Sequence, residues 1–147
     1  MKKLAVLFLA LALVPFGAFA APSTLVYGTT EKLTDLDTGS SWDFHTWEFF
    51  QNISEGLMTY TPGTTTLVPG LAEKLDANAA GDEYTVTLRK GLKFSNGDVL
   101  DAAAVKWSVD RVVALKGDPE SLISSYVDTV TVKDPLTVVF KLSLIHI

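Results

Sequence analysis

Two histidines, His45 and His146, are the side chains best suited to metal or acid–base chemistry in this sequence. Neither has a second ligand at the spacing of a zinc site, and the sequence contains no cysteine. His45 is expected to be an ordinary residue in the first turn of a helix. The sequence therefore predicts no metal site, no disulfide and no thiol nucleophile.

Acidic and hydroxyl side chains offer two other kinds of site. Asp35 and Asp37 begin like a calcium-binding loop, but Gly39 takes the third ligand position and Ser40 stands where the turn needs glycine. No serine lies in a G-x-S-x-G turn, and the glycines form neither a phosphate-binding loop nor a dinucleotide-binding fingerprint. These patterns predict a protein that is not an enzyme and holds no cofactor.

A strand, a turn and a helix are predicted in immediate succession over residues 84–113. Tyr84, Val86 and Leu88 alternate with polar residues, which is typical of an antiparallel strand with one buried face. The residues 95–98 (S-N-G-D) predict a tight turn. Asp101 is placed to cap a helix, whose buried face we expect to be formed by three valines at helical spacing: Val105, Val109 and Val112.

The elements before this stretch are predicted from shorter patterns. We expect a first strand over 25–30 and a helix over 44–55, capped by Asp43 and ended by Gly56 in the left-handed conformation. On that helix an aromatic and aliphatic stripe is expected to be buried: Trp47, Phe50 and Ile53. Residues 57–61 and 65–68 should form a hairpin, and residues 71–75 a short helical turn.

The last predicted element is a second hairpin, and the overall charge limits the possible partners. Residues 127–133 and 137–142 alternate on either side of an Asp-Pro turn. The net charge of −5 at pH 7 gives no basic surface for nucleic acid or for an anionic membrane.

The N-terminus has the features of a secretory signal peptide. Lys2 and Lys3 precede an apolar run over 4–14, and small residues stand at Ala18 and Ala20. Cleavage is predicted between Ala20 and Ala21, which makes residues 1–20 the signal peptide. Because no cysteine follows the cleavage site, no lipid can be attached there, and we expect a soluble protein of the periplasm with no membrane insertion after cleavage.

Three segments together resemble the family 5 solute-binding proteins, the extracytoplasmic receptors of peptide and nickel ABC transporters. They are E-G-L at 55–57, L-V-P-G-L-A at 67–72, and the run from T-V-T-L-R through K-F-S-N-G to D-A-A-A-V-K-W-S-V-D-R over 85–111. The resemblance covers residues from about Leu25 to Leu142 and keeps the order of the family.

The resemblance implies an α/β, periplasmic-binding-protein type II-like fold with two lobes. Because family members are several times longer, residues 21–147 would be the N-terminal part of lobe I with most of its extra subdomain. That is an incomplete fold of mixed and antiparallel strands with short helices. The alternative is a small secreted structural or interaction domain without catalytic activity.

The resemblance also implies a function and a candidate site. The function is capture of a small solute, most readily a di- or oligopeptide, for an inner-membrane ABC permease. The loop after the first strand would approach the solute: Thr30, Glu31, Lys32 and Leu33. Glu31 could meet an amino group of the solute and Lys32 a carboxylate.

Overall fold

The computed structural model describes residues 24–30 and 32–143, and it divides the chain into two units, Met1–Thr30 and Glu31–Ile147. In the first, residues 24–29 form neither helix nor strand, and the side chain of Leu25 is 91% exposed. The strand predicted over 25–30 is therefore wrong. An apolar pattern forms a strand only where a neighbouring strand pairs with its backbone, and no described sheet includes these residues.

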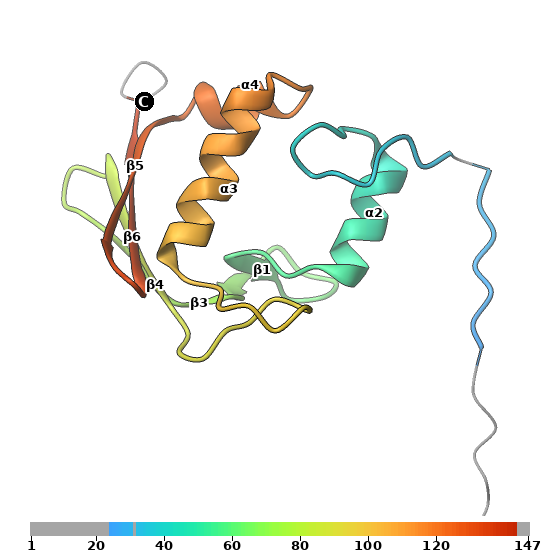
Figure 1. Cartoon of the computed structure of the whole chain (residues 1–147), viewed down its shortest axis with the longest axis horizontal. Coiled ribbons are helices and arrows are strands. Elements are labelled where there is room, and N and C mark those ends of the chain that lie inside the picture. The colour runs from blue at the N-terminus through green and yellow to red at the C-terminus, as the bar shows by residue number, and fades with distance from the viewer. Residues whose placement is uncertain (1–23, 31, 144–147) are drawn as a thin grey trace, which may run out of the picture. The chain divides into compact units, whose positions relative to one another are not determined.

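The second unit is built on a four-stranded sheet in the order β3-β4-β6-β5 (Figure 1). Its strands are β3 Ala72–Ala77, β4 Glu83–Leu88, β5 Val127–Asp134 and β6 Thr137–Leu142. Every neighbouring pair is antiparallel. The predicted strand at 84–88 and the predicted C-terminal hairpin are confirmed, and these two regions supply the three strands β4, β6 and β5.

Strand β3 corrects the expected helical turn at 71–75. Alanine, glutamate, lysine and leucine favour a helix, yet here they pair along β4 in the register Ala72 with Leu88 and Leu75 with Val86. Both Ala72 and Leu88 are fully buried. Pairing with β4 and burial against the core therefore outweigh the weak local preference for helix.

Helix α3, Ala102–Leu115, packs on the sheet beside β5 and β6 (Figure 1). The carboxylate of Asp101 accepts a hydrogen bond from the backbone N–H of Ala104 at 2.9 Å, which confirms the predicted cap. Val105 and Val109 pack against the buried cluster. The helix ends at Lys116 in the left-handed conformation and is followed by the short helix α4, Glu120–Ser124, which no pattern predicted.

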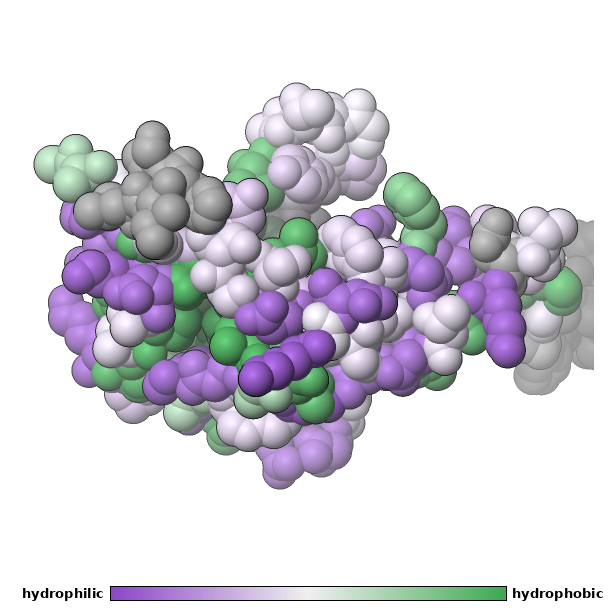
Figure 2. Space-filling model, turned by 90° about the horizontal axis from the view of Figure 1, so that it is seen from above, coloured by the Kyte–Doolittle hydropathy of each residue, from purple (hydrophilic) through white to green (hydrophobic). Residues whose placement is uncertain are grey.

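The core cluster joins the sheet to the start of α3. Its buried members are small or branched apolar side chains: Ala72, Val86, Leu88, Ala102, Val130 and Val138. Elsewhere polar side chains interrupt the apolar surface, as Figure 2 shows for one face of the molecule, where apolar side chains appear between polar ones.

Before the sheet lie helix α2, Phe44–Ile53, and the hairpin of β1, Met58–Tyr60, with β2, Leu67–Pro69. Antiparallel pairing of β1 with β2 confirms the predicted hairpin, and Gly63 in its turn has a φ of 74°.

Two expectations for α2 are wrong. The helix ends at Ser54, whose backbone is extended, and Gly56 has no positive φ. The expected stripe is not buried either, because Ile53 is 62% and Trp47 37% exposed, and the buried residue of the helix is Thr46. Helical spacing brings these side chains to one face, but that face is buried only where another element covers it.

Candidate functional site

The structure places two of the four predicted solute-contacting residues in the second unit. Lys32 and Leu33 are exposed at the start of the loop that leads to α2. Thr30 is exposed and belongs to the first unit, and Glu31 lies outside the described residues, as do Ala20 and Ala21. The structure therefore shows Lys32 and Leu33 as exposed neighbours in the second unit.

The loop that follows Leu33 is closed by hydrogen bonds between its two ends. The hydroxyl of Thr34 donates to the carboxylate of Asp43, and the hydroxyl of Ser41 donates to the same carboxylate at 3.0 Å. The other oxygen of Asp43 caps α2 by accepting from the N–H of Thr46 at 2.8 Å. These bonds, that from Thr34 above all, hold the pKa of Asp43 well below its usual range. Asp43 therefore serves as a charged acceptor that joins the loop to the helix.

The middle of the same loop is held by an ion pair with helix α3. Arg111 donates from Nη1 to Asp37 Oδ1 at 2.8 Å and from Nη2 to Oδ2, a two-pronged arrangement between residues 74 positions apart. The N–H of Gly39 adds a bond to Asp37 Oδ1 at 2.9 Å. The bonds from Arg111 and then from Gly39 lower the pKa of Asp37 to about 2. Asp37 is thus an anchor for the loop and not the start of a calcium site.

We expect this ion pair to make stability depend on pH over a defined range. The pKa of Asp37 is about 2 in the folded chain against an ordinary value of 3.8, so its stabilising effect is complete above about pH 4 and is lost as the pH falls towards about 2. The Asp37→Asn variant should be less stable than the parent at neutral pH, and the difference should close on acidification. Urea unfolding of both proteins between about pH 2 and pH 7 measures the difference in their free energies of unfolding. A difference that does not change with pH would contradict the assigned role of Asp37.

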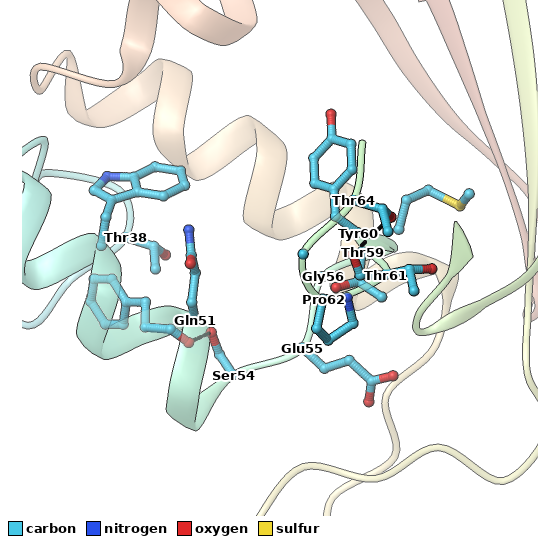
Figure 3. A pocket seen from close by; sticks show the side chains of 14 residues that line it. Thr38, Gln51, Ser54, Glu55, Gly56, Thr59, Tyr60, Thr61, Pro62 and Thr64 are labelled. Carbon is cyan, nitrogen blue, oxygen red and sulfur yellow. Dashed lines mark hydrogen bonds between the residues drawn. The ribbon is translucent and has the colours of Figure 1, made fainter. Parts of the chain in front are cut away.

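A cavity lies between α2 and the β1–β2 hairpin in the second unit (Figure 3). Its volume is about 680 Å³, and its walls include the aromatic side chains of Trp47, Phe50 and Tyr60. Gln51 stands on the helix side and Tyr60 on the hairpin side (Figure 3). Aromatic faces with a few amide and hydroxyl groups suit an uncharged or weakly polar organic group. No pattern predicted this cavity, because it depends on how the hairpin is placed beside the helix.

The segments that carry the family resemblance meet next to this cavity. Glu55 of E-G-L forms an ion pair with Arg89 of T-V-T-L-R at 2.7 Å. The N–H of Arg89 also donates to the carbonyl of Leu71, and the N–H of Leu71 donates to the carbonyl of Gly56. These contacts assign a structural role to the three segments: they fix the hairpin to the first strands of the sheet.

Side chains that could bind a metal ion do not cluster in the part of the chain that the structure describes. There, no three histidine, aspartate or glutamate side chains gather closely enough to hold an ion. In the first turn of α2, Nδ1 of His45 lies 3.6 Å from Oε2 of Glu48. His146 falls outside the described residues. Among residues 24–30 and 32–143, moreover, no helix has the length and apolar character needed to cross a membrane.

Curated proteins of similar sequence are named for peptides. The glutathione-binding protein GsiB of Salmonella paratyphi A is 32% identical over 142 residues, covering 93% of this chain and 27% of that protein. Di/tripeptide-binding protein 4 of Pseudomonas aeruginosa is 38% identical over 69 residues, covering 43% of this chain and 13% of its own length. The chain thus spans about a quarter or less of these relatives.

Solved structures of solute-binding proteins have a similar fold. A periplasmic oligopeptide-binding protein of Borrelia burgdorferi matches 74% of this chain with a TM-score of 0.71 at 21% identity, over 25% of its own length. NikA of Brucella suis, solved with Fe(III)-EDTA, matches 60% of this chain with a TM-score of 0.55 at 35% identity, over 18% of its length. The model of the family described as bacterial extracellular solute-binding proteins, family 5 Middle, matches residues 66–144, just over half of the 147. This chain belongs to the family 5 bacterial extracellular solute-binding proteins.

Proposed function

We propose that this chain is the N-terminal part of an extracytoplasmic solute-binding protein that delivers its solute to an inner-membrane ABC permease. The family match over residues 66–144 carries the proposal. No catalytic step is included, because the sequence offers no nucleophile with a base beside it. Closure of two lobes around the solute would signal its presence to the permease.

The solute class that we propose is a di- or oligopeptide. Relatives named for dipeptides, di/tripeptides and glutathione support it, and glutathione is itself a tripeptide. A peptide offers backbone donors and acceptors, a free amino group and a carboxylate, so a binding protein can hold many sequences through groups that all peptides share.

The proposed contacts are the loop residues Thr30, Glu31, Lys32 and Leu33. Glu31 would meet the amino group of the peptide and Lys32 its carboxylate, while Thr30 and Leu33 would offer backbone groups for strand-like pairing. The exposure of Lys32 and Leu33 in the second unit supports this assignment. Neither side chain takes part in a hydrogen bond that closes the loop, since those bonds begin at Thr34.

Export is part of the same proposal. Residues 1–20 would be removed between Ala20 and Ala21, and residues 21–147 would begin the mature solute-binding domain in the periplasm. N-terminal sequencing and the intact mass of the protein recovered from the cell envelope test both points. A mature protein that begins elsewhere than Ala21 would overturn the assigned cleavage site.

The function is tested with the complete exported product of the gene and a panel of dipeptides, tripeptides and glutathione. A peptide that binds the folded state should raise stability by about 2.7 kcal/mol at a concentration of 100 times its Kd. Lys32→Gln should weaken the binding of peptides with a free carboxylate more than the binding of their amidated forms. Lys90→Gln, an exposed change outside the loop, serves as control. If no peptide stabilises the protein, while a nickel complex or another solute does, the peptide assignment is wrong.

A further inference from the structure

The loop that carries the proposed solute contacts is seated on helix α3. Gly39 lies so close to the helix that an added Cβ would come within 2.8 Å of Arg111 Nη1 and 2.9 Å of Leu115 Cδ1. On the other side, a Cβ on Gly117 would come within 2.9 Å of Ser40 Cα. Two glycines from distant parts of the chain therefore permit a contact that larger residues would prevent.

The ion pair of Asp37 and Arg111 lies at the centre of this contact. The guanidinium of Arg111 makes two bonds to the carboxylate and also lies 5.8 Å from the ring centroid of Trp107 on the preceding turn. A planar guanidinium can form this two-pronged bond and face a ring at once, whereas an ammonium group cannot. The pair thus fixes the orientation of the loop as well as its distance from α3.

Helix α3 gives the loop a rigid support. Its Val105 and Val109 pack against the core cluster, and its first turn is capped by Asp101. Only three positions separate Leu33 from Asp37, and Thr34 between them is bonded to Asp43. The backbone from Thr34 to Asp37 is therefore restrained at both ends, which limits the directions in which Lys32 and Leu33 can leave it.

We propose that Asp37 and Arg111 are positioning residues that hold the loop, and with it Lys32 and Leu33, in the solute-binding conformation before the solute arrives. This inference rests on the proposed function. A loop that is already ordered loses less conformational entropy on binding, so removal of the restraint should weaken binding without removing any contact to the solute. It also gives a role to the arginine that ends the D-A-A-A-V-K-W-S-V-D-R segment.

The test compares Arg111→Lys, Asp37→Asn and the double variant in the complete exported protein. Each single variant is expected to weaken peptide binding by roughly tenfold. The double variant should be no weaker than either single one, because the two residues act as one unit. Lys106→Gln, which breaks the exposed ion pair with Asp110 on the same helix at 2.8 Å, is the matched control and should bind as the parent does.

Amide hydrogen exchange provides a second measurement that does not need a solute. Peptides covering residues 32–41 should exchange faster in Arg111→Lys than in the parent, while those covering β4 and β6 should not change. Unchanged exchange in the loop, or unchanged affinity with the parent binding peptide, would overturn the inference. If the parent binds no peptide but its loop loses protection in Arg111→Lys, the proposed function fails and the restraint of the loop by Asp37 and Arg111 stands.

Discussion

Replacement of Leu88 by alanine is expected to lower the free energy of unfolding by roughly 3 kcal/mol, within the range of about 2–5 kcal/mol for a buried leucine. Leu88 is fully buried at the end of β4, where it lies opposite Ala72 in the register of the sheet. Its backbone N–H donates to the carbonyl of Leu136, and that bond remains in the variant. The loss should therefore come from the removed side chain and the cavity that it leaves.

Leu75→Ala is the matched control for this prediction. Leu75 lies on the neighbouring strand β3 and is 37% exposed, so its truncation removes less buried surface and should cost about 1 kcal/mol or less. Urea unfolding of the two variants and the parent gives the comparison. Equal losses at the two positions would contradict the difference in burial between Leu88 on β4 and Leu75 on β3.

Elements with local signals could be predicted from the sequence. The cap at Asp101 depends on a side chain and an N–H three residues away, and the turn at Gly97, with a φ of 93°, depends on four consecutive residues. The alternating strands β4 and β6 also carry their pattern within themselves. Such features depend on residues close together in the chain, so the order of residue types is enough to predict them.

Elements decided by distant partners could not be predicted in this way. Residues 72–77 have the composition of a helix, but they form a strand because their backbone pairs with that of β4. Residues 25–30 are apolar enough at their start to suggest a strand and form none in the described structure. Trp47 and Ile53 have helical spacing on α2, yet spacing alone does not supply an element that covers them. In each case the missing information is the identity of the neighbour.

The candidate site shows the same division. The loop at 30–33 was proposed through resemblance to a family, and the structure describes Lys32 and Leu33 as exposed. The ion pair that anchors this loop joins Asp37 to an arginine 74 positions away. The sequence alone suggests only a calcium-ligand role for Asp37, because the fold decides which charged side chain lies beside it. The contact between Glu55 and Arg89, which lie 34 positions apart, could not be predicted for the same reason.

The second large effect is expected at Gly70, where alanine should lower the free energy of unfolding by roughly 2–3 kcal/mol or more. A Cβ at this position would lie closer than 3.0 Å to the carbonyl oxygen of Gly56, and a backbone atom cannot move aside as the end of a side chain can. The same junction includes the bonds from the N–H groups of Gly70 and Ala72 to the carbonyl of Leu57, both 3.0 Å long. Separation of the two backbones would stretch these bonds.

Gly28→Ala is the control for Gly70→Ala, because an added Cβ at Gly28 would meet no atom within 4 Å and should change stability by less than about 0.5 kcal/mol. Glycine-to-alanine replacement also lowers the entropy of the unfolded chain equally in both variants, so the difference between them isolates the clash. Hydrogen exchange should show the loss of protection centred on residues 56–58 and 70–72. A Gly70→Ala protein as stable as the Gly28→Ala control would show that the E-G-L and V-P-G-L-A segments do not meet as closely as described.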